Sequence, residues 1–150
     1  MPPRTIQLLV YNSRLFNAHW SIFVPRANDP NIGSVVGGFA LEFVRNYDIT
    51  TDSRPIQRID LATVPEEHVK DTDGDEEVID GNANPIDRLE EVIVTVPVPG
   101  PSLRPNTAAP DKRIEMRGCQ WWTKQAIAAL IAAGLFNEEA QTVADNAPVQ

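Results

Sequence analysis

Two side chains in this 150-residue sequence could together perform covalent chemistry: the single cysteine, Cys119, and one of the two histidines, His19. A thiolate is a strong nucleophile, and histidine is the usual base that generates it. We therefore expect a small Cys–His thiol enzyme that transfers or hydrolyses an acyl group on an amide, ester or thioester. Cys119 would be the nucleophile, and His19 would act first as base and then as acid.

Cys119 begins the clearest predicted helix, which continues to Ala133 without proline or internal glycine. Trp122 and Leu130 belong to a buried stripe at helical spacing, and Gly134 predicts a left-handed stop. In a first turn, unpaired backbone N–H groups would lower the pKa of the thiol and form an oxyanion hole. The alternative is that Cys119 is a small buried hydrophobe, and its position alone leaves both interpretations open.

His19 begins a predicted strand between apolar residues, and its alternative role is that of a core histidine bonded to a backbone carbonyl. His68 lies in an acidic stretch and is expected to be a solvated surface residue. A catalytic histidine needs a group that orients its ring. No candidate stands out among Glu42, Asn12 and Asn46.

The residues around Cys119 suggest a pocket. Gln120 could donate its side-chain amide to an oxyanion, or it could be an exposed helix residue. Trp122 is expected in the core, whereas Trp121 could line the mouth of the pocket or cover the sheet. The aromatic candidates for the pocket are Tyr11, Trp20, Trp121 and Trp122. A second hypothesis keeps this pocket and drops covalent chemistry, so that the protein binds an apolar small molecule.

The order of the predicted elements indicates an α+β fold in one domain, 1–150, with an antiparallel sheet of about four to five strands packed against the Cys-bearing helix and a second, shorter helix. The strands are predicted at 6–11, 19–24 (ended by Pro25), 34–36 and 39–44 around Gly37-Gly38, and 56–64, with a short one at 113–116. The second helix is expected to start at Asn84-Pro85, and a weak one at 138–143. We expect an acidic solvated loop at 66–83, a loop at 29–33 and a frayed tail at 144–150.

The composition excludes several classes of function. A formal net charge of −8 without a basic patch argues against nucleic acid and anionic membranes as partners. One cysteine excludes an internal disulfide, and the absence of a long apolar segment favours a cytoplasmic protein. Asp71-x-Asp73-Gly74-Asp75 fails the calcium-loop pattern at Glu76 and Asn82, so we expect no metal and no cofactor. A small-molecule substrate is the expected partner, and the acidic loop suggests a third hypothesis, a non-enzymatic interaction module.

The order of His19 and Cys119 resembles the circularly permuted papain-like fold of the NlpC and lecithin:retinol acyltransferase type. The resemblance implies that the Cys helix packs across the sheet that carries the histidine. The chain is also similar to small uncharacterised fungal proteins with five motifs, which are found here at 19–25, 39–48, 85–90, 99–103 and 119–122. That similarity implies the fold more than a function. Under the second hypothesis, the small molecule would be a fungal secondary metabolite, and the protein would act as a cyclase or isomerase through shape and polar contacts. Gly118 replaces the usual asparagine before the cysteine, and Val36-Gly37 replaces the polar strand that normally orients the base.

Overall fold

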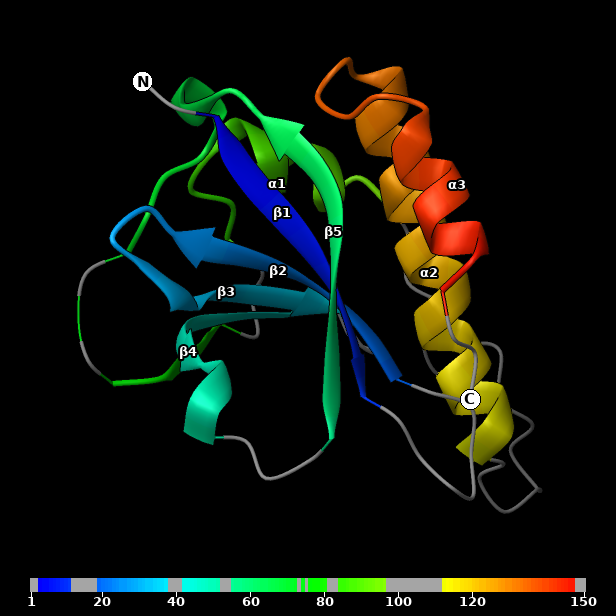
Figure 1. The fold of residues 1–150 in the computed structure, drawn as a ribbon, viewed down its shortest axis with the longest axis horizontal. Coiled ribbons are helices and arrows are strands. Elements are labelled where there is room, and N and C mark those ends of the chain that lie inside the picture. The colour runs from blue at the N-terminus through cyan, green and yellow to red at the C-terminus, as the bar shows by residue number, and fades with distance from the viewer. Residues whose placement is uncertain are drawn as a thin grey trace.

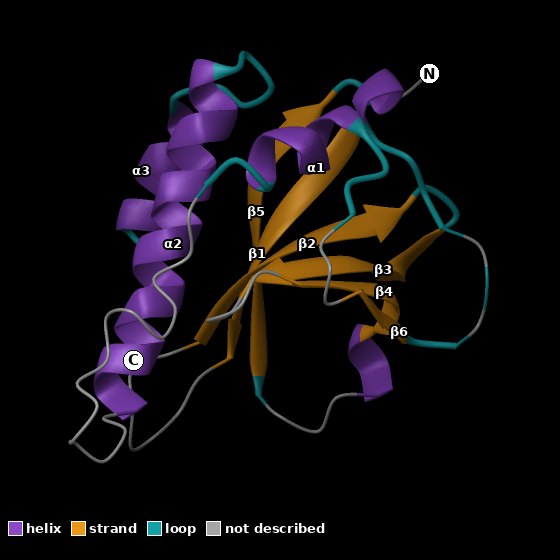
Figure 2. Cartoon of the chain, turned by 180° about the vertical axis from the view of Figure 1, so that it is seen from behind, coloured by secondary structure: helices purple, strands orange, loops and turns teal. Residues whose placement is uncertain are grey.

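The computed structural model describes residues 3–11, 19–37, 42–51, 55–72, 74, 76–80, 84–96 and 112–147, and for 37, 42 and 112–119 it describes the backbone alone. The described chain forms an α+β fold in which helices α2 and α3 run side by side along the sheet (Figure 1). Helix α1 packs near one end of the same sheet, as Figure 2 shows from behind. The predicted α+β class is therefore confirmed, and the permuted papain-like arrangement stays a prediction.

All strands pair antiparallel in the order β5-β1-β2-β3-β4-β6. The strands are β1 (Arg4–Tyr11), β2 (His19–Arg26), β3 (Asp29–Gly37), β4 (Glu42–Asp48), β5 (Ile56–Val64) and β6 (Val78–Asp80). In the described residues the sheet thus has six strands, which exceeds the predicted four to five. The prediction missed β6 because three residues inside an acidic segment are too few to show a periodic pattern.

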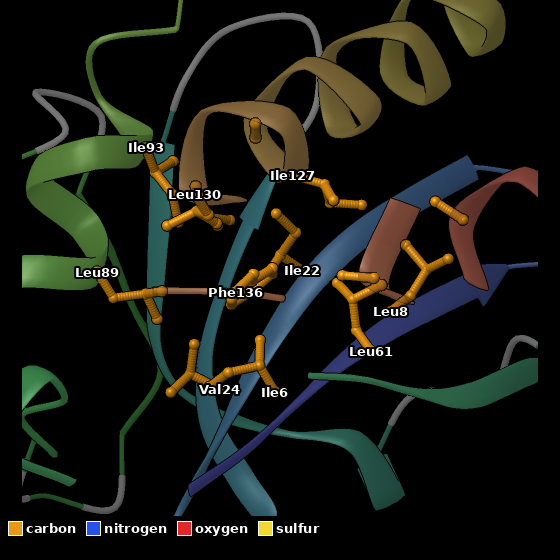
Figure 3. Close-up of a cluster of buried hydrophobic side chains, with 14 of the residues drawn as sticks. Ile6, Leu8, Ile22, Val24, Leu61, Leu89, Ile93, Ile127, Leu130 and Phe136 are labelled. Atoms are coloured by element: carbon orange, nitrogen blue, oxygen red, sulfur yellow. The ribbon is translucent and has the colours of Figure 1, made fainter. Parts of the chain in front are cut away.

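The main core lies between the helices and one face of the sheet. Alternate residues of a strand point to opposite faces. Trp20, Ile22 and Val24 accordingly join the main core, whereas Phe23 belongs to a smaller apolar cluster. Figure 3 shows this packing, with contributions from helices α1 and α2 and from strands β1 and β2: Ile6, Leu8, Ile22, Val24, Leu89, Ile93, Ile127 and Leu130. No helix in the described part of the chain is long and apolar enough to cross a membrane.

The second strand is longer than predicted. Pro25 does not end β2, because the register shifts between Pro25 and Arg26 and a bulge tolerates a missing N–H donor. The predicted loop at 29–33 is instead the first half of β3. Gly33 is required there, since a Cβ atom at this position would lie 2.0 Å from the carbonyl oxygen of Val24. The predicted turn at Gly37-Gly38 falls largely outside the described residues.

Helix α1 (Arg88–Ile93) begins later than predicted. Its N-cap is Asp87, whose Oδ1 accepts a hydrogen bond from the backbone N–H of Glu90 at 2.8 Å. Asn84 is not the cap; its carbonyl oxygen accepts a bond from Arg45. Asp87 followed by Glu90 three residues later is a local helix-start signature, which the prediction overlooked in favour of Asn84-Pro85.

Helix α2 (Lys112–Ala132) begins seven residues before Cys119. The predicted short strand at 113–116 is therefore wrong, and these residues form the first turns of the helix. The predicted stop is confirmed: Gly134 has φ of +81°, and the N–H of Leu135 bonds to the carbonyl of Leu130 at 3.0 Å. Helix α3 (Glu139–Asp145) follows, and Ala147 is buried, so part of the predicted frayed tail is packed.

Candidate functional site

His19 is held at the start of β2 by two polar neighbours. It pairs with Tyr11 of β1, and the two ring centroids lie 5.4 Å apart with an interplanar angle of 48°. The Nε2 atom of His19 lies 3.3 Å from the Oγ atom of Ser21. Ser21 and Tyr11 are buried, whereas the His19 ring is half-buried. The imidazole is thus oriented by its own strand and the neighbouring strand, and keeps a face toward solvent.

The sequence analysis missed Ser21 as a partner of His19. The period of a strand was the available signal, since residues two positions apart share a face. The register that sets Tyr11 opposite His19 was not available, because strand pairing is a long-range property. Neither Asn12 nor the side chain of Glu42 lies within the described residues.

The face on which His19 lies is opposite the helices. His19 and Ser21 alternate with Trp20, which is fully buried in the main core, and His19 stacks on Tyr11 of the smaller cluster. His19 is also the first residue of β2, so its ring sits at the end of the strand. The ring of His19 could therefore meet a side chain of helix α2 only beyond the start of β2.

Cys119 is the eighth residue of α2 and does not lie in its first turn. The unpaired amides of a helix belong to its first four residues, so those of α2 lie at its Lys112 end. The predicted activation of the thiol by a helix start, and the predicted oxyanion hole of backbone N–H groups, are therefore wrong for this helix. The side chain of Cys119 lies outside the described residues.

The elements that carry Cys119 and His19 are nevertheless neighbours. Trp122, three residues after Cys119, and Trp20, the residue after His19, are both fully buried in the main core. The ammonium group of Lys124 lies 5.8 Å from the centroid of the Trp20 ring. Helix α2 thus packs on strand β2 close to both predicted catalytic positions.

The four predicted pocket aromatics do not line one cavity. Trp20 and Trp122 are core residues, and the indole N–H of Trp122 donates to the carbonyl of Val96 at 3.2 Å. Trp121 is 50% exposed, and Tyr11 lies on the other face of the sheet. The core position predicted for Trp122 is confirmed, whereas the shared pocket is not formed by these residues.

Gln120 is buried and not an exposed helix residue, and the adjacent Thr123 is fully buried. Gln120 and Thr123 thus place polar side chains within the packed part of α2, one and four residues after Cys119. A surface pocket lined by Pro3, Pro65 and Val69, together with Glu66 and Glu67, lies beyond the opposite end of β1 from the Tyr11–His19 pair.

The predicted acidic loop at 66–83 is largely exposed in its described residues, and hydrogen bonds anchor it to the sheet. Asp71 accepts a hydrogen bond from Arg4 at 2.7 Å and another from the N–H of Ala27 at 3.0 Å. Arg26 donates to the carbonyl of Gly74 at 2.7 Å. His68 is half-buried, with its Nε2 atom 3.8 Å from a carboxylate oxygen of the exposed Glu67.

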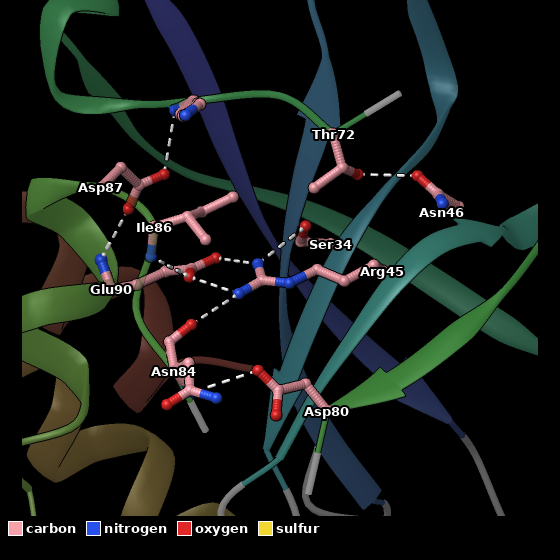
Figure 4. Close-up of polar contacts among 10 residues, drawn as sticks. Ser34, Arg45, Asn46, Thr72, Asp80, Asn84, Ile86, Asp87 and Glu90 are labelled. Carbon is pink, nitrogen blue, oxygen red and sulfur yellow. Dashed lines mark hydrogen bonds and ion pairs between the residues drawn. The ribbon is translucent and has the colours of Figure 1, made fainter. Parts of the chain in front are cut away.

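Asn46, a candidate to orient His19, holds this segment instead. Its backbone is left-handed, with φ of +58°. Its Nδ2 atom donates to the carbonyl of Glu76 at 3.0 Å, and its Oδ1 atom accepts from the hydroxyl of Thr72 at 2.7 Å. Figure 4 shows Asn46 and Thr72 beside the ion pair described next.

A buried ion pair connects the sheet to α1 (Figure 4). The guanidinium of Arg45 makes two bonds to the carboxylate of Glu90, one of them 2.7 Å between Nη2 and Oε1. Arg45 also donates to the hydroxyl of Ser34 and the carbonyl of Asn84, and Glu90 accepts from the N–H of Ile86 at 3.1 Å. Because both charges are paired and hydrogen-bonded, this cluster is a structural clamp.

Asp87 lies at the edge of the clamp and also joins it to the acidic segment. Its Oδ2 atom accepts from the N–H of Lys70 at 2.9 Å. Burial raises the pKa of Asp87 above its usual value, and the nearby carboxylate of Glu90 adds to this, while the bonds from Lys70 and Glu90 and the charge of Arg45 oppose it. The carboxyl group of Asp87 thus both caps α1 and holds the acidic segment at Lys70.

Comparison with family models matches residues 6–137 to a family of unknown function (DUF6540). Comparison with curated proteins and with solved structures found no match.

Proposed function

The chain belongs to this family of unknown function, DUF6540, so we propose its activity from its own residues: a small thiol enzyme that performs acyl transfer or hydrolysis on an amide, ester or thioester. Cys119 is the proposed nucleophile and His19 the proposed base. The observation that carries the proposal is the packing of α2 on β2 at Trp20 and Trp122. A permuted papain-like fold likewise packs its Cys helix on its His strand. Because His19 lies on the face of the sheet opposite the helices, its ring and the thiol would have to meet at the end of β2.

The proposed reaction has two steps. His19 accepts the proton of the Cys119 thiol, and the sulfur attacks the carbonyl carbon of the substrate. The imidazolium then returns the proton to the leaving amine, alcohol or thiol as its bond to the carbonyl breaks. Water, or an acceptor nucleophile, loses a proton to His19 and releases the acyl group from sulfur, which restores the free thiol.

Side chains and not helix-end amides would stabilise the oxyanion in this scheme. Gln120 is the candidate donor, because it follows Cys119 directly and is buried, and a side-chain amide away from water stabilises an oxyanion more strongly. Ser21 and Tyr11 would act as positioning residues for the base, since their contacts with His19 fix the plane of its ring.

The test is acylation with p-nitrophenyl acetate, followed by intact-mass spectrometry at short times. We expect one acetyl group on the parent, none on Cys119→Ser, and at least about tenfold slower labelling of His19→Ala, because general-base catalysis typically contributes about 10²–10⁴-fold. His68→Ala is the matched control, because His68 is the other histidine of the chain.

Two results would overturn the proposal. One is a parent protein that takes up no acetyl group under conditions where free cysteine reacts. The other is equal acetylation of the parent and His19→Ala, since the thiol would then react without the base. Circular dichroism of each variant separates loss of chemistry from loss of fold.

A further inference from the structure

Strand β6 (Val78–Asp80) forms one edge of the sheet, and β4 is its only paired neighbour in the described part of the chain (Figure 2). Val78 is 52% exposed and Ile79 is 61% exposed. With Trp121 they are the only exposed large hydrophobic residues among those described. An edge strand directs half of its backbone N–H and C=O groups away from its neighbour, where another strand can pair with them.

The edge is held in place from both sides. Before it, Asn46 fixes the carbonyl of Glu76, and Arg26 fixes that of Gly74. After it, the N–H of Asn84 donates to the carboxylate of Asp80 at 3.1 Å. A strand that is already ordered loses little conformational freedom when it pairs, so its short length is partly offset.

The charge around β6 has one sign. Residues 71–87 carry seven acidic side chains and no lysine, arginine or histidine, so their net charge is −7. The net charge of the whole chain is −8, so the negative charge is concentrated in this segment. Glu76 and Glu77, directly before the strand, are exposed. A partner strand would therefore meet apolar side chains flanked by negative charge.

We propose that β6 is a docking site for an extended segment of another protein, in which valine or isoleucine alternates with lysine or arginine. The segment would add to the sheet as a seventh strand through backbone hydrogen bonds. Because alternate residues point to opposite faces, its apolar side chains would cover Ile79 on one face of the sheet, and its basic side chains would lie on the face of Val78 and Asp80. The negative charge of Glu76 and Glu77, directly before the strand, would attract those basic side chains. This site is independent of the proposed thiol chemistry.

A second copy of this chain fits the same edge poorly. Pairing of two β6 strands would bring two segments of the same strong negative charge together, and like charges on facing strands are destabilising. The acidic residues thus keep identical edges apart and select a basic partner.

The test titrates an isotope-labelled protein with the peptide Ac-Lys-Val-Lys-Val-Lys-Val-Lys-amide and follows its amide NMR signals. We expect signals of β6 and β4 to move. Ile79→Thr keeps a β-branched residue, and Glu77→Lys reverses one charge. Each should raise Kd at least about fivefold at low salt. Glu138→Lys, the same charge reversal at the start of α3, should change Kd by less than about twofold.

Three results of the peptide titration would overturn the inference. They are no binding by the parent, equal binding by Ile79→Thr and the parent, and shifts confined to residues away from β6. Shifts of β6 that grow with protein concentration in the absence of peptide would also overturn it, because the occupant would then be a second copy. Thermal unfolding of each variant checks that the edge is intact.

Discussion

A double-mutant cycle at Arg45 and Glu90 tests the clamp between the sheet and α1. The parent pair is almost completely buried, with side-chain exposures of 8% and 4%. Glu90→Leu leaves the guanidinium buried without its counter-charge, which typically costs about 3–5 kcal/mol, and it also removes the acceptor of the Ile86 N–H. We therefore expect the free energy of unfolding to fall by about 4 kcal/mol or more.

The double variant Arg45→Met/Glu90→Leu removes both charges and keeps apolar volume. It should be more stable than Glu90→Leu alone, because only hydrogen bonds to Ile86, Asn84 and Ser34 are lost. The expected coupling between the two sites is at least about 2 kcal/mol. Urea unfolding followed by fluorescence of the buried Trp20 and Trp122 measures it. Additivity of the two single variants within about 0.5 kcal/mol would refute the clamp.

Three further predictions test single positions. Gly118→Ala should raise the free energy of unfolding by about 0.5–1 kcal/mol in urea titrations, because Gly118 lies inside α2; a loss of stability would contradict a helix that continues through it. Gly33→Ala should lower the free energy of unfolding by about 2 kcal/mol or more, because its Cβ atom would clash with the carbonyl of Val24. Gly134→Ala should lower it by about 1 kcal/mol, because there is open space around Gly134 and only its left-handed backbone is unfavourable for alanine. Equal losses for the two variants would refute the close approach of Gly33 to Val24. Because burial raises the pKa of Asp87 above 3.8, its contribution to stability is largest at low pH and is lost as pH rises through the folded-state pKa. The unfolding free energy of the parent minus that of Asp87→Asn should therefore fall as pH rises above the unfolded-state pKa, and a rise would reverse the assigned sign.

Several elements could be predicted because their signal is local. The strand at 56–64 has the predicted limits, and Gly134 ends α2 as predicted. Trp122 lies in the core because helical spacing places it on the buried stripe. These features depend on residues close together in the sequence.

Other features depend on contacts between distant residues. The acidic segment is anchored by bonds to Arg4, Arg26 and Asp87, which no local pattern records. The cap at Asp87 did have a local signal, Glu90 three residues later, and the prediction overlooked it. The helix predicted to begin at Cys119 begins seven residues earlier, at Lys112, because the residues before Gly118 also favour a helix. His19 was placed correctly at the start of its strand, but its support by Tyr11 requires the register of β1 and β2.

The central claim is that His19 activates Cys119, and the most direct measurement is the pH dependence of iodoacetamide alkylation. The single cysteine makes the rate specific for Cys119. We predict a thiol pKa below about 8.5 in the parent and in His68→Ala, and a higher value in His19→Ala. A slow reaction with the same pH profile in all three proteins would contradict the claim and identify Cys119 as a packing residue of α2.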